Sequence, residues 1–136
     1  MTASQISRPW IPWVLVPGLV FLVIGTFIAL MPRGYSVNLG LIGQGRPAVV
    51  QVYDDNAVHS HELMEAFNKI RGDYEARVEF LVANLSLQEG KSFSERYDAQ
   101  AITIVFFSPE GEVLHTLSGL QTPETLKKAI EQAFSF

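Results

Sequence analysis

The longest apolar run of the chain lies near its start. Residues 11–31 include no charged side chain, and Thr26 is the single Ser, Thr, Asn or Gln among them. At 1.5 Å per residue this run forms a helix about 31 Å long, which is enough to cross the core of a bilayer. A cleaved signal peptide is the alternative, but its apolar core is usually shorter, and Ala29-Leu30-Met31-Pro32 is a poor cleavage site. We therefore expect an N-terminal tail over residues 1–10 and one transmembrane helix over residues 11–32.

Three small residues fall near one another on one face of this expected helix. They are Gly18, Gly25 and Ala29, and the last two form a small-xxx-small pair. Such a pair lets a second helix approach closely within a membrane. Glycine is also common in membrane helices without this role, so the packing face is a hypothesis.

After a Gly-rich linker over residues 33–46, short apolar runs alternate with helical patterns. Strands are predicted where β-branched and apolar residues cluster, and helices where apolar residues recur every three or four positions. The order is strand, helix, strand, short helix, then a hairpin and a final helix, which predicts a layered α/β domain over residues 47–136. The predicted strands cover residues 48–53, 78–85, 101–107 and 112–117. The predicted helices run from a cap at Asp54–Asn56 to about Arg71 before Gly72, over 92–97, and from Thr122 or Pro123 to Phe134.

Charge is distributed unevenly along the chain. All 14 acidic residues lie beyond residue 50, whereas the part after Arg33 carries eight Lys and Arg. This acidic balance argues against binding of nucleic acid or of anionic lipid headgroups. The positive residues that flank the apolar run, Arg8 against Arg33 and Arg46, are too evenly divided to fix its orientation.

One polar cluster stands out as a candidate for chemistry. His59-Ser60-His61 follows Asp54 and Asp55 at the start of a predicted helix. Histidines and carboxylates bind metals, but a zinc site needs three or four ligands, and histidines two positions apart on a helix point in different directions. His59 and His61 are therefore weak metal candidates, and a hydrolase built on Ser60 lacks a nucleophile-elbow pattern. We expect no metal and no cofactor, with solvated capping as the simpler interpretation.

Three segments, in order and spacing, resemble the core of thioredoxin between about Arg46 and Phe134. The run Pro47-Ala-Val-Val-Gln-Val-Tyr53 is similar to the strand before the redox loop of that family. The run from Tyr97 to Val113, which contains Ala-Ile-Thr-Ile-Val-Phe-Phe-Ser-Pro-Glu-Gly-Glu-Val, is similar to the family's strand and hairpin, and Ser118-Gly119 precedes the last helix. The resemblance implies a thioredoxin-like mixed sheet flanked by helices.

The departures from the family pattern fall on its chemistry. Ala57 and Ser60 stand where the family has the attacking and resolving cysteines, and the whole chain contains no cysteine. Gln51 replaces the buried acid, and Thr103 replaces the cis-proline, so a trans bond is expected there. Because the thiolate is the nucleophile of thiol–disulfide exchange, that activity is excluded. We call residues 54–60 the vacated loop.

The sequence therefore predicts a redox-inactive, membrane-anchored module that acts by protein–protein contact, as an accessory or assembly subunit of a membrane complex. It is not expected to be an enzyme or to bind a small-molecule substrate. The alternatives are an enzyme or metal protein that uses His59, Ser60 and His61, and a non-catalytic, chaperone-like helper of thiol-active proteins. Membrane-anchored relatives of thioredoxin usually hold their domain outside the cytoplasm, so the resemblance implies a periplasmic or lumenal domain. The candidate contact surface consists of Asp54, Asp55, Asn56, Ala57, Val58, His59, Ser60 and Thr103.

Overall fold

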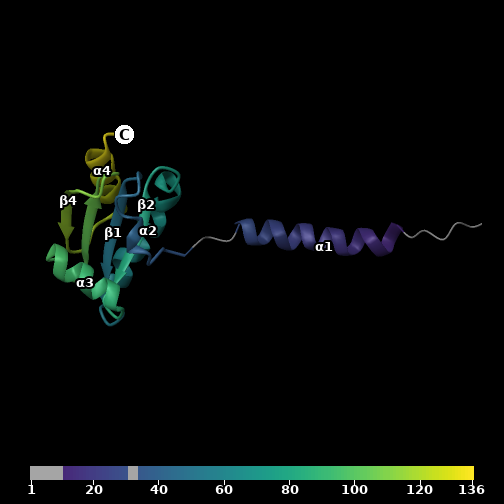
Figure 1. The fold of residues 1–136 in the computed structure, drawn as a ribbon, viewed down its shortest axis with the longest axis horizontal. Coiled ribbons are helices and arrows are strands. Elements are labelled where there is room, and N and C mark those ends of the chain that lie inside the picture. The colour runs from purple at the N-terminus through teal and green to yellow at the C-terminus, as the bar shows by residue number, and fades with distance from the viewer. Residues whose placement is uncertain (1–10, 31–33) are drawn as a thin grey trace, which may run out of the picture. The chain divides into compact units, whose positions relative to one another are not determined.

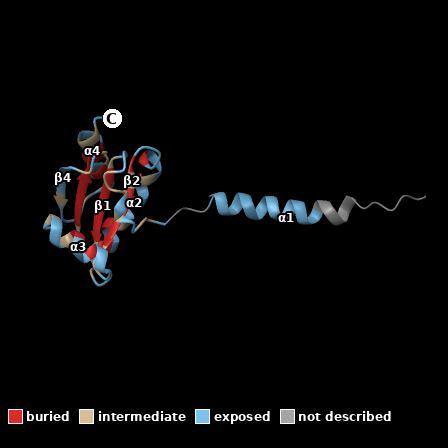
Figure 2. Cartoon of the chain, viewed as in Figure 1, coloured by how far each residue is buried: buried red, intermediate tan, exposed pale blue. Residues whose placement is uncertain are grey.

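The computed structural model describes residues 11–30 and 34–136, and the chain divides into two compact units, up to Gly34 and from Tyr35 onward. In the first unit, α1 (Ile11–Leu30) forms where an uncharged apolar run was found. Its side chains are described from Val16 onward, and all of them are exposed (Figure 2). Counting only the residues that the structure describes, no helix is both long enough and apolar enough to cross a membrane. The membrane span predicted over residues 11–32 is thus not confirmed, and the tail over residues 1–10 lies outside the described residues.

The second unit is an α/β domain on one four-stranded sheet (Figure 1). Its elements are β1 (Ala48–Tyr53), α2 (Val58–Tyr74), β2 (Glu79–Asn84), α3 (Gln88–Tyr97), β3 (Thr103–Phe107), β4 (Val113–Ser118) and α4 (Pro123–Phe134). The strand order is β2-β1-β3-β4. β1 and β2 are parallel and are connected by α2, whereas β3 is antiparallel to β1 and β4 is antiparallel to β3. The mixed α/β sheet predicted from the sequence is confirmed.

Helices cover both faces of the sheet, because successive strand residues point to opposite sides. On one face α2 and α4 contribute Phe67, Ile70 and Leu126 to a core that also contains Val49 and Phe106. On the other face α3 contributes one buried aromatic side chain to a second core, which includes Val50, Val52, Leu81, Phe93 and Phe107. The strands between these layers are buried along their middle, whereas β4 at the sheet edge is mostly exposed (Figure 2).

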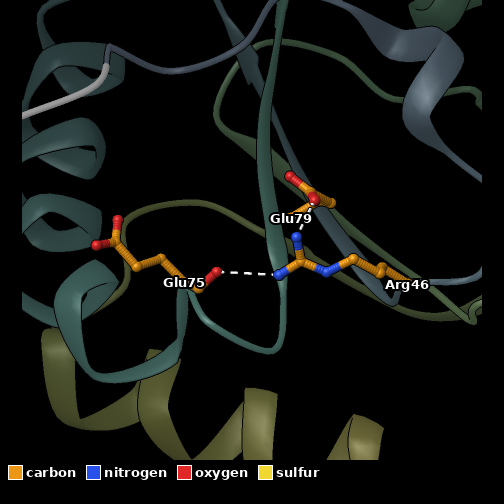
Figure 3. Close-up of polar contacts among 3 residues, drawn as sticks. All are labelled: Arg46, Glu75 and Glu79. Carbon is orange, nitrogen blue, oxygen red and sulfur yellow. Dashed lines mark hydrogen bonds and ion pairs between the residues drawn. The ribbon is translucent and has the colours of Figure 1, made fainter. Parts of the chain in front are cut away.

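Most of the segment predicted as a linker packs onto the domain. Ser36 forms a parallel bridge with Leu81 of β2, and a 3-10 helix, η1 (Leu39–Leu41), packs on the second core. Figure 3 shows how the end of the segment is held: Arg46 pairs with Glu79 at the start of β2 and donates to the carbonyl of Glu75 at 3.0 Å. The Gly-rich sequence did not indicate this docking, which depends on the bridge at Ser36, the two polar contacts of Arg46 and the apolar contacts of η1.

Docking of this segment changes the pKa of one tyrosine, Tyr35. The Tyr35 hydroxyl donates to Asn68 at 2.9 Å, and the Arg71 guanidinium lies 4.7 Å from its ring centroid. Burial raises the pKa of Tyr35 to about 12, although the Arg71 charge acts in the opposite direction.

We expect the domain to lose stability as the pH rises from about 10 to 12, because unfolded tyrosine ionises near 10 whereas folded Tyr35 keeps its proton. Denaturation at a series of pH values, with Tyr35→Phe as the control, measures this loss. Ionisation of Tyr35 near pH 10 in a difference titration of the two chains would show that the segment is not docked.

Two helices differ from their predicted bounds. α2 continues through Gly72 to Tyr74, whose ring is buried and whose hydroxyl donates to Glu131 of α4 at 2.8 Å. α3 begins at Gln88 rather than at residue 92, after Leu87, which provides no side-chain cap. The first turn of α3 lies so close to the end of β2 that a Cβ at Gly90 would come within 1.9 Å of the Asn84 carbonyl oxygen. Tertiary packing, not local propensity, sets both boundaries.

Candidate functional site

The vacated loop connects the end of β1 to the start of α2. The Asp54 carboxylate accepts a hydrogen bond from the backbone N–H of Asn56 at 2.9 Å, which closes a turn within the loop. Ala57 is the N-cap of α2 and provides no side-chain cap. The capping role predicted for the three residues before the helix is thus wrong in detail, since Asp54 stabilises the loop instead.

Ser60 occupies the deepest position of this site. Its side chain is fully buried, and its hydroxyl accepts from the backbone N–H of Asp54 at 3.2 Å. Its backbone N–H donates to the Ala57 carbonyl at 2.9 Å, so the two positions lie one turn apart. The hydroxyl that stands at the expected site of a resolving thiol therefore holds the loop against the helix.

Gln51 of β1 lies beneath the loop, on the face of the sheet covered by α2. Its side-chain amide donates to the Ser60 carbonyl at 3.0 Å, whereas its Oε1 atom is buried without a partner among the described residues. A buried acceptor with no partner carries a desolvation penalty.

Replacing Gln51 with methionine should raise the free energy of unfolding by about 1 kcal/mol, because it removes the orphaned oxygen while nearly preserving volume. The Ser60 carbonyl keeps its ordinary place in the helical hydrogen-bond pattern. Chemical denaturation of Gln51→Met measures the change, with Gln51→Glu as a variant expected to destabilise at neutral pH by burying a charge. A clear loss of stability in Gln51→Met would show that the amide is held by a satisfied network.

The two histidines point to different neighbours. His59 contacts the Glu62 carboxylate at 3.3 Å on the exposed face of α2. His61 meets the Tyr53 hydroxyl at 2.9 Å, and their rings lie edge to face with centroids 5.3 Å apart. The structure therefore does not bring His59, Ser60 and His61 together, and no group of three His, Asp or Glu residues in the described part of the chain could hold a metal ion.

The vacated loop is hydrogen-bonded to the loop that follows β2. Asp55 accepts from the Ser86 hydroxyl at 2.7 Å and from the Asn84 amide at 3.4 Å, at the end of β2. The Asn84 side-chain oxygen also accepts from the backbone N–H of Ser86 at 2.8 Å. The sequence pattern did not identify this contact, although the carboxyl ends of parallel β1 and β2 necessarily meet at one edge.

The charged groups nearest Tyr53 at this edge of the sheet are two carboxylates, Asp54 and Asp55. Burial is the main cause that raises the pKa of Tyr53, and the Asp55 and Asp54 carboxylates add to it. The Tyr53 hydroxyl serves as the hydrogen-bond partner of His61. Within the described residues, the site combines hydrogen-bonding groups and carboxylates but contains no activated nucleophile.

Thr103 lies at the same end of the sheet, as the resemblance implied. It is buried and pairs in register with Val52, two residues before the loop. The peptide bond before it is trans, as expected, because the described residues contain no cis bond. Ile102 adopts a left-handed conformation with φ of 64° and donates to the Val52 carbonyl at 3.1 Å, which delays the start of β3 to Thr103.

The exposed part of the vacated loop is small and mixed. Val58 is the first residue of α2 and keeps 69% of its surface exposed, although it is apolar. Asp55, Asn56 and His59 are exposed beside it, whereas Ala57 is half-buried. A groove of about 680 Å³ lies elsewhere, between η1 and α3, and its lining includes Phe93, Tyr97 and Arg96 but no residue of the loop.

The predicted helix-packing face of α1 is open. A Cβ atom at Gly18 or at Gly25 would meet nothing within 4 Å, and Ala29 is exposed. Nothing in the described residues tests whether a second helix packs there, so the packing face stays a prediction.

The comparisons with known proteins concern the fold. No protein-family model matches the chain, and no curated protein matches its sequence. An uncharacterised thioredoxin-like protein from Clostridium perfringens matches with a TM-score of 0.67 and 18% identity, over 79% of this chain and 86% of that one. A thioredoxin from Malassezia sympodialis matches with a TM-score of 0.60 and 22% identity, over 69% and 82%. The domain thus has a thioredoxin-like fold, and because the chain contains no cysteine it is inactive in thiol–disulfide exchange.

Proposed function

We propose that this chain is a membrane-anchored, redox-inactive thioredoxin-like module that binds another membrane protein as an accessory or assembly subunit. The observation that carries the proposal is the role of Ser60. Ser60 stands where a redox-active loop would have a reactive thiol. Its backbone N–H donates to Ala57, and its hydroxyl accepts from the Asp54 nitrogen at 3.2 Å, so Ser60 fixes the loop. A fixed loop without a nucleophile can act by presenting a surface.

The anchor is proposed from sequence length and composition. α1 contains 20 residues and no charge, so it would extend for about 30 Å, the thickness of a bilayer core. Large apolar side chains such as Leu19, Phe21 and Phe27 are exposed along it, which is costly in water and favourable in lipid. We place the domain on the periplasmic or lumenal side, as the resemblance implies. Protease protection of the domain in intact membrane vesicles tests that side.

The contact surface is proposed to be the exposed part of the vacated loop. Asp55 is tied to Ser86 across the two loops at 2.7 Å, and Asp54 closes the turn that leads to Ala57. A surface held in one conformation loses little entropy on binding. Val58 offers an apolar anchor, and the neighbouring carboxylates favour a partner with basic groups nearby.

Photo-crosslinking from Val58 in native membranes tests this surface. A photoreactive residue at Val58 is expected to give one discrete adduct with a membrane protein, whereas the same residue at Gln132, exposed on α4, gives none. The adduct should disappear when Asp55 is replaced by lysine, which reverses the charge of the surface. Equal labelling from both positions, or an adduct that survives the charge reversal, would refute the proposed surface.

A further inference from the structure

β4 forms one edge of the sheet and is exposed along most of its length. The strand covers Val113–Ser118, and Val113 and Leu114 keep 47% and 46% of their surfaces exposed although both are apolar. The opposite edge, β2, is partly covered because Ser36 forms a parallel bridge with Leu81. One edge of the sheet is therefore partly covered by the chain, whereas the other edge, β4, is left open.

The outward backbone groups of β4 can be assigned from the register. The Ser108 N–H donates to the Glu112 carbonyl at 2.8 Å, so the even-numbered residues of β3 direct their backbone groups toward β4. Their partners in register are His115, opposite Phe106, and Leu117, opposite Ile104. The alternation directs the backbone N–H and C=O of Thr116 away from the sheet, where no strand in the described residues pairs with them.

This edge lacks the usual protection against strand pairing. Natural edge strands are blocked by lysine, proline, inward charges or bulges that twist them away. Residues 113–122 contain no charged residue and no proline, and the irregularity in the β3–β4 register lies near Val113, before the outward groups of Thr116. An uncharged edge with free backbone groups fits an added strand that is also uncharged.

We propose that a second copy of this chain supplies that strand, so that two β4 edges pair antiparallel across a two-fold axis. The position of the one charge beside the strand, Glu112, favours this occupant. In an antiparallel pair, Glu112 of each copy lies opposite the uncharged stretch that follows Leu117 in the other copy, so no like charges meet. The same strand then pairs with its own copy, as a two-fold contact requires. The pairing joins the two sheets into one and leaves the vacated loop out of the contact.

Proline substitution at the outward position tests the pairing in the full chain purified in mild detergent. Thr116→Pro removes an N–H that the domain does not use, so the domain stays folded while association weakens by about tenfold or more, since one hydrogen bond is lost on each side of the axis. The matched Thr116→Val keeps the N–H and the β-branched shape, and it should associate as the native chain does. Thr116→Lys, a natural edge blocker, provides a second disrupting variant. Sedimentation measures the mass of each variant, and circular dichroism checks that it is folded.

The absence of native cysteine allows a second readout. Thr116→Cys places one thiol at the proposed axis, and a short bismaleimide should link two copies there, whereas Gln132→Cys on α4 should give no linked pair. A native chain that is monomeric, a Thr116→Pro chain that stays folded and associates as tightly as the native one, or equal linking from both cysteines would each overturn the proposal. Loss of association in both blocking variants with linkage at Thr116→Cys would support it.

Discussion

Replacing Ala57 and Ser60 with cysteine is expected to create an intramolecular disulfide in a chain that has none. Ala57 is the N-cap of α2, and the Ser60 N–H donates to its carbonyl at 2.9 Å, so the two side chains start one helical turn apart. This separation suits the narrow geometry of a disulfide. A cysteine at a helix N-terminus also has a lowered pKa, which increases the reactive thiolate. Loss of two hydrogens on oxidation, seen by mass spectrometry, measures the bond.

The matched control moves one cysteine by one position. In Val58→Cys combined with Ser60→Cys, one side chain is largely exposed and the other is fully buried, so they point apart. This pair should remain reduced within the monomer under the same conditions. Failure of the Ala57 and Ser60 pair to close in a folded domain would contradict the equivalence of the vacated loop to a redox loop.

Replacing Gly90 with alanine is expected to destabilise the domain strongly. The added Cβ would lie 1.9 Å from the Asn84 carbonyl oxygen and 2.4 Å from its carbonyl carbon, and backbone atoms cannot rotate aside as a side chain can. Either α3 or the end of β2 must move, at a cost of about 3 kcal/mol or more. For a domain of this size, the melting temperature should fall by about 10–20 °C. Because Asn84 also contacts Asp55, the vacated loop should become more mobile at the same time.

Gly72→Ala is the matched control for this effect. Gly72 lies inside α2, is exposed, and has no atom within 4 Å of its added Cβ. Alanine loses less backbone entropy in a helix, so this variant should be more stable by about 0.5–1 kcal/mol. Thermal unfolding of the two variants compares them directly, and a similar melting temperature for both would show that α3 does not pack on β2 as described.

The hydrophobic pattern was sufficient to predict the elements with strong periodicity. The strand over residues 48–53 coincides with β1, and the apolar positions of α2 and α4 face the core as predicted. The hairpin at Pro109–Gly111 is confirmed, with Gly111 at φ of 90°. These elements follow from local sequence because burial on a defined face requires a defined period.

The features that could not be predicted from the sequence depend on contacts between residues that lie far apart along the chain. The start of α3 has a glycine and no capping side chain, so its first turn forms because it packs on Asn84. The segment over residues 35–46 reads as a linker, yet Tyr35 and η1 dock on the domain. At the candidate site, the resemblance identified Ser60 and Gln51 as replacements for a cysteine and for the buried acid. The hydrogen bond from the Gln51 amide to the Ser60 carbonyl could not be predicted, because it depends on how α2 lies on the sheet. The pairing of Asp55 with Ser86 likewise appears only when two loops are placed together.

The mass of the native chain, extracted from its own membrane in mild detergent, tests the central claim most directly. If the chain is a module that binds another membrane protein, it should migrate in a complex heavier than two copies of itself, and Asp55→Lys should release it. A chain that migrates as a monomer or as a pair of copies alone, with no further protein in stoichiometric amount, would contradict the account.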